Sequence, residues 1–392
     1  MMLIGIWKIV SPETSSFRKR IYQVYSVSFH VFCYSAAISL LAEIPTLAKS
    51  NMVIAMDNAN RFTVYVFIII KMIAWQSKRM VDLRAVVLRQ DSEMLATSQI
   101  DPVVGRLYRR HVKYNHKFIF VLVASGTVIP ITILAVGRIL GWVNIYQFMQ
   151  SPGHFNATEK PLPQPYWYPF DRNEHYLVAL VDQNVRPTLS CFCLGVTSAS
   201  LNSLAIFVRV QLKVLQHYFQ HFHRSQEKVI HRLKLLCVKH QRLITYTKEL
   251  SESLQYIVLL DYTVSSVTFA LMIVQITTVS DLEQTETTLK RFLTQGEQFL
   301  INFVILIFTT LQLLTFSWNC NEIIVQSMEL AKALFESDWY DQGRSVQKLI
   351  YVMMMRCQKP LYLRIGWLGV MDLNAGISRL KLGYSYTSIM NN

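Results

Sequence analysis

Polar residues recur at helical spacing in the segment 365–390 and just beyond it. On a helix that turns about 100° per residue, the polar side chains within roughly 40° of one line are Asn374, Ser378, Lys381, Ser385 and Asn392. Hydroxyl and amide oxygens can replace part of the water around a passing cation, and a branched apolar side chain can narrow its path. We therefore predict that Ser385, Ile389 and Asn392 line a pore, with Ile389 as its outer constriction.

The same segment is long enough to cross a hydrocarbon core of about 30 Å as a helix. Buried charges such as Asp372 and Arg379 make it too polar to face lipid, because each costs roughly 2.5 to 3.5 kcal/mol there. The alternative is an amphipathic helix that lies on a membrane surface or packs on a soluble core. Lys381 is unfavourable in a cation path, so we expect it to lie along a subunit interface or to pair with an acid such as Asp372.

Other reactive side chains form no recognisable catalytic or metal site. His217 and His221 are four residues apart, as metal ligands on a helix often are, but no acid or thiol follows nearby in the sequence. Glu43, Asp261 and Asp372 could suggest a proton-coupled transporter, yet they are scattered and lack matching halves with broken helices. We predict no metal, no cofactor and no enzymatic activity.

The composition indicates a membrane protein that crosses the bilayer several times. Of the 392 residues, 52% are hydrophobic and 16% charged, and the mean hydropathy is +0.27. The net charge of +14 lies between apolar spans, which argues against a nucleic-acid partner and for membrane lipid. With the last segment we predict an all-α fold of seven transmembrane helices, the first six at 28–47, 62–76, 118–140, 189–210, 254–278 and 299–317. Lys71 in the short second span is expected to reach toward the inner headgroups.

The distribution of Lys and Arg predicts the orientation. The tail and the segments 78–117, 209–248 and 332–364 carry 28 of them, against 8 in the intervening set. By the positive-inside tendency the N-terminus is inside and the C-terminus outside, the reverse of a G-protein-coupled receptor. The six cysteines avoid the outer loops, so a stapling disulfide is not expected there.

The long outer loop 141–184 holds the sequon at Asn156 and a run rich in proline and aromatics at 161–169. We predict that Asn156 is glycosylated and that the loop forms an ordered lid.

Three helices are expected to continue below the membrane. Residues 299–336 contain no Gly or Pro and would extend roughly 57 Å as a helix. The segment 228–252 carries leucines at helical spacing, and a short helix at 344–357 ends before Pro360. The chain then divides into spans one to four (1–208), a cytoplasmic extension (209–253), spans five and six (254–317), a cytoplasmic anchor (318–360) and the pore helix (361–392).

At this anchor the residues resemble a known family. The runs ALFESDWY at 333–340, MRCQKPL at 355–361 and LKLGYSYT at 380–387 are similar to the C-terminal signature of insect odorant receptors, and His240-Gln241 with Leu243 resembles a weaker pattern. Phe335 stands where the family often has Tyr, which keeps the ring and loses a hydroxyl.

The resemblance implies an odorant-gated, non-selective cation channel of four subunits in the plasma membrane of olfactory sensory neurons. The last helix of each subunit would line the pore, and the cytoplasmic anchor would hold the subunits together through Trp339, Tyr340, Pro360 and Tyr384. An odour-specific member would assemble with a shared co-receptor. The segment 209–253 lacks the long insertion of that co-receptor, which favours the odour-specific subunit. The alternatives are a gustatory-type ligand-gated channel and a G-protein-coupled receptor.

The odorant is expected in the outer half of the bundle, among apolar walls with few polar groups. By depth along the predicted spans the candidates are Tyr65, Ile68, Thr132, Val136, Phe192, Phe269 and Ile273. Ordinary helix packing is the alternative role for each of them.

Overall fold

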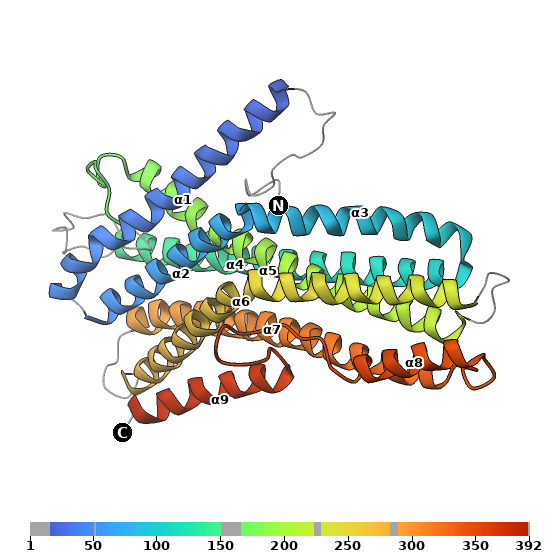
Figure 1. The fold of residues 1–392 in the computed structure, drawn as a ribbon. Helices are drawn as coiled ribbons and strands as arrows, with labels where there is room; N and C mark the ends of the chain where they lie inside the picture. Colours follow the sequence, from blue (N-terminus) through green and yellow to red (C-terminus); the bar gives the residue numbers. More distant parts are fainter. Residues whose placement is uncertain (1–15, 51, 150–165, 223–228, 283–288, 391–392) are drawn as a thin grey trace.

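The computed structural model describes residues 16–50, 52–149, 166–222, 229–282 and 289–390, and every named element there is a helix. Figure 1 shows them in one elongated bundle, in which α7 runs through almost the whole length. Their bounds are α1 (Ser16–Ser50), α2 (Met52–Gln76), α3 (Lys78–Ile100), α4 (Pro102–Met149), α5 (Tyr176–Gln220), α6 (Val229–Leu282), α7 (Leu289–Phe335), α8 (Arg344–Cys357) and α9 (Leu373–Met390).

The predicted spans and cytoplasmic helices agree with these elements. The first six apolar runs fall within α1, α2, α4, α5, α6 and α7, and α8 has the predicted bounds. Long α6 and α7 continue past their spans, as their uninterrupted apolar spacing predicted. In the described residues, Ser16–Lys49 of α1 and Tyr176–Gln220 of α5 pass a test of length and composition for crossing a membrane.

The sequence did not predict helix α3 or the first turns of α4, because their segment, 78–117, was interpreted only through its content of Lys and Arg. Asp101 separates the two helices, and its carboxylate accepts hydrogen bonds from the backbone amides of Val103 and Val104 at 2.9 and 3.2 Å. Pro102 then occupies the first position of α4, where its missing amide hydrogen costs nothing. An Asp-Pro pair therefore starts a new helix at the turn.

The last helix begins later than predicted, at Leu373 and not at Ile365. Gly366 and Gly369 have φ values of 49° and 129°, which place both in the region that favours glycine and stop a helix there. A bridge joins Arg364 to Val370. The residues before Leu373 thus form a tight hairpin, and the pore helix is shorter than the sequence indicated.

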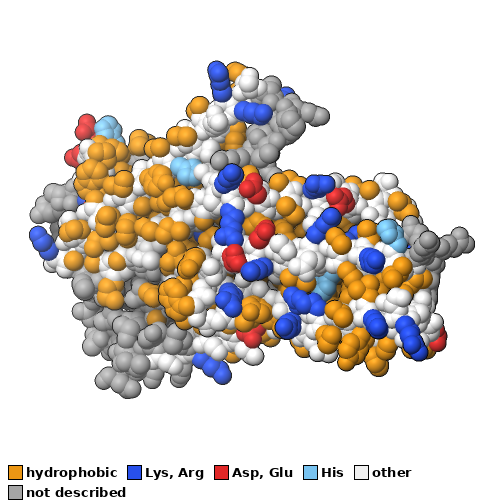
Figure 2. All heavy atoms as spheres, in the orientation of Figure 1, with side chains coloured by type: hydrophobic (Ala, Val, Ile, Leu, Met, Phe, Trp, Pro, Cys, Tyr) orange, Lys and Arg blue, Asp and Glu red, His pale blue; other side chains and the backbone are white. Residues whose placement is uncertain are grey.

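The two ends of the bundle differ in surface chemistry. Figure 2 shows hydrophobic side chains spread over the half that holds α1 and α2, whereas Lys and Arg side chains gather over the half that holds α3 and α8. This division matches the alternation of apolar spans and basic segments in the sequence.

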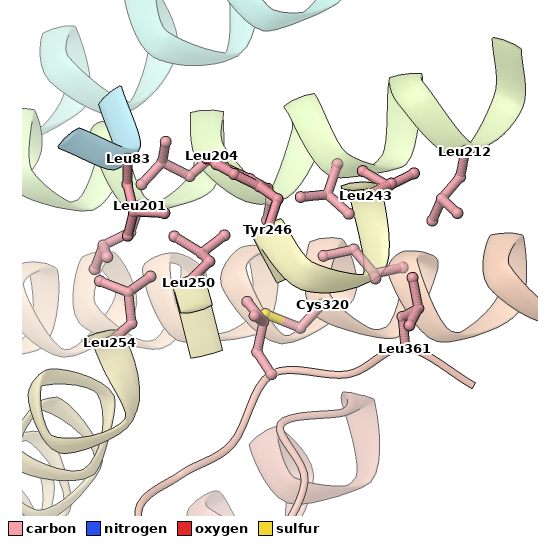
Figure 3. Close-up of a cluster of buried hydrophobic side chains, with 14 of the residues drawn as sticks. Leu83, Leu201, Leu204, Leu212, Leu243, Tyr246, Leu250, Leu254, Cys320 and Leu361 are labelled. Carbon is pink, nitrogen blue, oxygen red and sulfur yellow. The ribbon is translucent and has the colours of Figure 1, made fainter. Parts of the chain in front are cut away.

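The main core joins α5, α6, α7 and α8 (Figure 3). The predicted leucine row of α6, Leu233, Leu236, Leu243 and Leu250, is buried in it, and Leu361 enters from the segment before α9. In a water-exposed region each fully buried side chain of this kind contributes about 1.5 to 3 kcal/mol. The core therefore gives the end below the predicted spans a firm scaffold on which α9 is mounted.

Candidate pore helix and ligand site

Two backbone amides of the hairpin before α9 donate hydrogen bonds to α6. The Arg364 amide donates to the Ser251 hydroxyl at 3.1 Å, and the Gly366 amide donates to the Gln255 carbonyl at 3.0 Å. A side chain at Gly366 would also meet the Leu259 side chain at 2.8 Å. The start of the last helix is therefore fixed against α6.

A row of polar side chains on α9 faces away from its own bundle. Asn374, Ser378, Lys381 and Ser385 are all exposed. These are four of the residues that the sequence places on one line, and the Ser385 hydroxyl donates to the Lys381 carbonyl at 3.0 Å. The structure brings the predicted polar stripe to the surface of the protomer, where another subunit or a shared water path can meet it.

Ile389 lies in the last described turn of α9, but its side chain falls outside the described part, and Asn392 lies beyond it. The proposed constriction therefore stays a prediction.

The opposite side of α9 is packed on α6 and α7. Arg379 is 6% exposed, and its guanidinium carbon lies 5.4 Å from the centre of the Tyr262 ring on α6. Asp372 accepts a hydrogen bond from the Ala375 amide at 2.7 Å and so caps the helix N-terminus. Among the residues that the structure describes, Lys381 forms no ion pair with Asp372, so of the two positions expected for Lys381 the one along a subunit interface stays a prediction.

Helix α9 approaches α7 closely at Gly376. A Cβ atom there would lie 2.5 Å from the Ser317 hydroxyl oxygen, so a larger residue would force the helices apart. Small residues allow such close packing in membranes, where lipid supplies no hydrophobic drive for helix association.

The ligand-site candidates fall in two neighbouring clusters and in undescribed turns. Tyr65 is buried with Ala36, Leu40 and Tyr166, while Ile68 is buried in the main core and Phe192 packs against that core. Phe269 of α6 is half-buried. Thr132, Val136 and Ile273 lie on α4 and α6 in turns whose side chains are outside the described part. The structure thus packs Tyr65 of α2 against α1 and Tyr166, and a pocket shared by all the candidates stays a prediction.

The predicted aromatic lid is ordered where the structure describes it, from residue 166 on. The Trp167 amide donates to the Ser39 carbonyl at 3.2 Å, which holds the lid on α1. Arg186 of α5 lies 5.3 Å from the Tyr166 ring centre and pairs with Asp182 at 2.7 Å. Sequence reasoning did not find this arginine, although a cation near an aromatic-rich loop is a recognisable signal. Asn156 lies outside the described residues.

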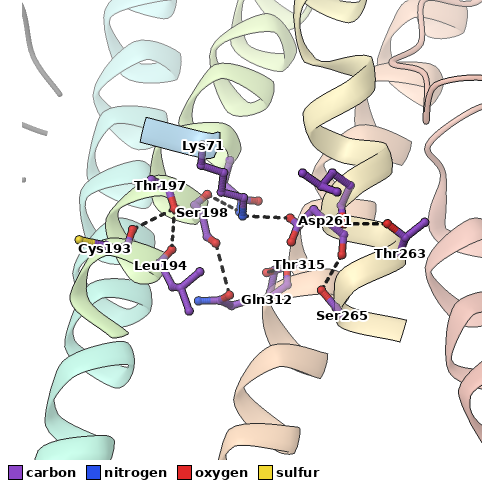
Figure 4. A network of polar contacts seen from close by, with 12 residues as sticks. Lys71, Cys193, Leu194, Thr197, Ser198, Asp261, Thr263, Ser265, Gln312 and Thr315 are labelled. Atoms are coloured by element: carbon purple, nitrogen blue, oxygen red, sulfur yellow. Dashed lines mark hydrogen bonds and ion pairs between the residues drawn. The ribbon is translucent and has the colours of Figure 1, made fainter. Parts of the chain in front are cut away.

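A polar network joins α2, α5, α6 and α7 (Figure 4). Lys71 of α2 points toward Asp261 of α6, with 3.4 Å between ammonium nitrogen and carboxylate oxygen. Ser198 of α5 donates to Gln312 of α7 at 3.3 Å beside them. Lys71 is 1% exposed, so the expectation that it reaches the headgroups is wrong. An acid far away in the sequence holds it inside.

The anchor residues divide into buried and exposed members. Trp339 packs against the main core, while Tyr340 and Pro360 are exposed. Phe335 is 67% exposed at the end of α7, so this end of the protomer presents apolar surface that a neighbouring subunit could cover. Tyr384 lies on α9 with its side chain outside the described part.

His240, from the weaker family pattern, is a buried packing residue of the anchor. Its ring lies edge-on to Phe219, 6.3 Å between centres, and its Nδ1 atom is 4.0 Å from the Cys357 sulfur. Burial, with repulsion from Arg356, lowers the pKa of His240 to about 4. The ring is therefore neutral near pH 7.

The histidine pair lies close to an acidic residue that is far away in the sequence. His217 and His221 have ring centres 4.6 Å apart, and Asp101 lies 3.9 Å from His217. In the described residues, His, Cys, Asp and Glu side chains form no group of three that could hold a metal ion.

A helical bundle with long apolar spans, a basic end and a polar last helix defines a multi-span membrane receptor or channel. A family profile described as "7tm Odorant receptor" matches residues 51–384, and the chain belongs to this family. The chain is thus a member of an odorant-receptor family of membrane proteins and not an enzyme.

Individual relatives are distant in sequence. Odorant receptor 10 of Aedes albopictus is 25% identical over 194 residues, 48% of each chain, so our chain spans about half the length of that relative. Odorant receptor 30a of Drosophila melanogaster is 20% identical over 295 residues, 74% of each. The solved olfactory receptor OR5 of Machilis hrabei, in complex with eugenol, superposes with a TM-score of 0.67 at 14% identity, covering 99% of this chain and 94% of that one. That likeness shows the fold, and the described elements confirm the all-α part of the prediction.

Proposed function

We propose that this chain is the odour-specific subunit of a ligand-gated, non-selective cation channel. The observation that carries the proposal is the exposed polar row of α9, Asn374, Ser378, Lys381 and Ser385, on the side turned away from its own bundle. Such a row cannot face hydrocarbon at low cost, so it must meet protein or water. Four copies around one axis would give these side chains a shared aqueous path, with Ile389 and Asn392 toward its outer end. Lys381, the charged member, turns toward a neighbouring subunit.

The ligand is a small volatile molecule bound in the outer half of the bundle. Tyr65 and Ile68 on α2 and the half-buried Phe192 and Phe269 offer apolar and aromatic surface there, to which Thr132, Val136 and Ile273 would add. The odorant opens the channel by binding more tightly to the open arrangement than to the closed one.

The partner is a co-receptor subunit of the same family in a heterotetramer. The exposed apolar surface formed by Phe335 at the end of α7 and by Tyr340 just beyond it supports an intersubunit anchor near Trp339, Pro360 and Tyr384. The N-terminus and this anchor lie in the cytoplasm of an olfactory sensory neuron, and the loop with Asn156 lies outside the plasma membrane. A mobility shift on enzymatic removal of N-glycans that Asn156→Gln abolishes would support this orientation; protease cleavage of an N-terminal tag in intact cells would contradict it.

The decisive experiment is co-expression with an insect co-receptor under voltage clamp. A panel of volatile alcohols, esters and phenols, including eugenol, should evoke a cation current within milliseconds and without added nucleotide. A response that needs GTP would favour a G-protein-coupled receptor instead. Ile389→Ala should change conductance or resting leak; no change in either would remove Ile389 from the pore.

A further inference from the structure

The inner part of the bundle holds two buried cations beside one carboxylate. Lys71 of α2 is 1% exposed and Arg379 of α9 is 6% exposed. Asp261 of α6 lies within electrostatic reach of both. A buried charge is expensive unless a counter-ion compensates it, and one carboxylate cannot fully compensate two cations. Lys71 and Arg379 therefore compete for the one carboxylate of Asp261.

In the present arrangement the carboxylate belongs to Lys71. The ammonium nitrogen lies 3.4 Å from an Asp261 oxygen (Figure 4). It also lies 4.1 Å from the centre of the Phe67 ring. Arg379 instead rests on the face of Tyr262, the residue next to Asp261, and forms no ion pair in the described part of the chain. The Asp261 side chain keeps 33% of its surface exposed, so it is not enclosed by Lys71.

A change of partner would move the pore helix in a defined direction. Arg379 lies on the side of α9 that packs on α6, opposite the exposed row that includes Ser378 and Lys381. A direct Arg379–Asp261 pair would therefore draw α9 toward its own bundle and away from the axis shared by the subunits. Gly376, three residues before Arg379, packs tightly against Ser317. This contact would be the point about which α9 turns. Two packed arrangements that differ in one ion pair are a common basis of switching.

We propose that Asp261 is a counter-ion shared by Lys71 and Arg379, an inference that rests on the channel function proposed above. When the channel opens, Asp261 changes its partner from Lys71 to Arg379. This change draws α9 away from the axis shared by the subunits. Lys71 and Arg379 are then positioning residues for the pore helix: Lys71 favours the closed arrangement and Arg379 the open one. Neither needs to touch the odorant or the permeating cation.

The test measures currents without odorant and at saturating odorant for the unmodified subunit and its variants, each with the co-receptor and at matched surface expression. Lys71→Met frees Asp261 for Arg379, so the odorant-free current should rise about fivefold or more, the lower range of typical coupling between sites. Replacement of external sodium by N-methyl-D-glucamine should abolish that current. Lys71→Arg, which keeps the charge, should leave it low.

Arg379→Met tests the same idea from the other side, because it leaves the Lys71–Asp261 pair in place. The odorant-evoked current should fall about fivefold or more while the odorant-free current stays low. In the double variant the odorant-free current should return to that of the unmodified channel, because Asp261 then has no cation to move to. A purely structural role would not produce this cancellation.

A matched control is Arg89→Met, which removes an exposed arginine paired with Glu93 at 3.4 Å on α3. It should change neither current. The proposal is overturned if Lys71→Met leaks no more than this control, or if the double variant leaks as much as Lys71→Met. Should Lys71→Met not reach the surface, an unaltered evoked current in Arg379→Met overturns it alone. Absence of current from the unmodified pair would instead refute the channel function and, with it, this inference.

Discussion

In the half of the bundle that holds α8, predicted to be cytoplasmic, leucines such as Leu233 and Leu243 of α6 are buried against neighbouring helices, whereas in the half predicted to lie in the membrane α1 exposes Ile38 and Leu41. Water drives the first set inward, but lipid is as apolar as leucine and gives the second set no such drive. Association in the membrane half must then come from close contacts and polar pairs, such as Gly376 on Ser317. We therefore expect the half that holds α8 to be rigid and the packing of α9, the proposed pore helix, to be adjustable.

The largest expected contrast comes from truncating one leucine in each half. Leu243→Ala should lower the free energy of unfolding by about 2 to 5 kcal/mol, because it leaves a cavity in a tightly packed core. Leu41→Ala on the exposed face of α1 should change it by less than about 0.5 kcal/mol. Size-exclusion chromatography after stepwise heating follows the thermal stability of both variants. Equal losses for the two variants would show that the halves do not differ as described.

The half that holds α8 should also be the acid-sensitive half. The pKa of His240 is lowered to about 4 from its ordinary value of 6.5. The unfolded chain binds this proton more readily, so the stabilisation is complete above about pH 6.5 and is lost as pH falls toward 4. The full effect is about 3 kcal/mol.

Melting temperatures at pH 7.5, 6 and 5 should therefore fall, and His240→Gln should flatten the decline. Some slope will remain, because burial and nearby cations also lower the pKa of His111 to about 4. An unchanged slope in His240→Gln would remove His240 as the cause.

Removing the N-terminal cap of α9 or that of α4 distinguishes an effect on channel opening from an effect on stability. Asp372→Ala removes the cap of α9 and Asp101→Ala that of α4, each at a cost of about 1 kcal/mol. Only the first should alter channel opening, by up to about fivefold in the odorant concentration for half-maximal current. Concentration–response curves and melting temperatures measure the two effects. A similar shift in opening for Asp101→Ala would contradict the adjustable-pore interpretation.

The smallest effect on stability should accompany a clear effect on conduction. Ser385→Leu places an apolar side chain in the exposed row of α9 and should lower single-channel conductance, with stability unchanged within about 0.5 kcal/mol. Ser92→Leu is the matched control, because Ser92 is also an exposed helical serine whose hydroxyl donates to a backbone carbonyl of its own helix, that of Arg89 at 2.7 Å. Unaltered conductance in Ser385→Leu would remove Ser385 from the pore wall.

The sequence by itself determined the features that depend on neighbouring residues. Apolar runs located the spans, leucine spacing located the buried face of α6, and the break at Pro360 located the end of α8. Periodicity is local, so it is legible without knowing which helices meet. The same local signal showed the polar line on α9 that the structure leaves exposed.

Only the tertiary structure decided the features that depend on distant partners. Lys71 and Asp261 meet across three intervening helices of the chain, and no spacing rule links them. The hairpin at Gly366 and Gly369 required backbone angles that the sequence merely permits. Which cation holds a shared carboxylate depends on how α2, α6 and α9 pack, because ion pairing acts over a few ångströms and not along the sequence.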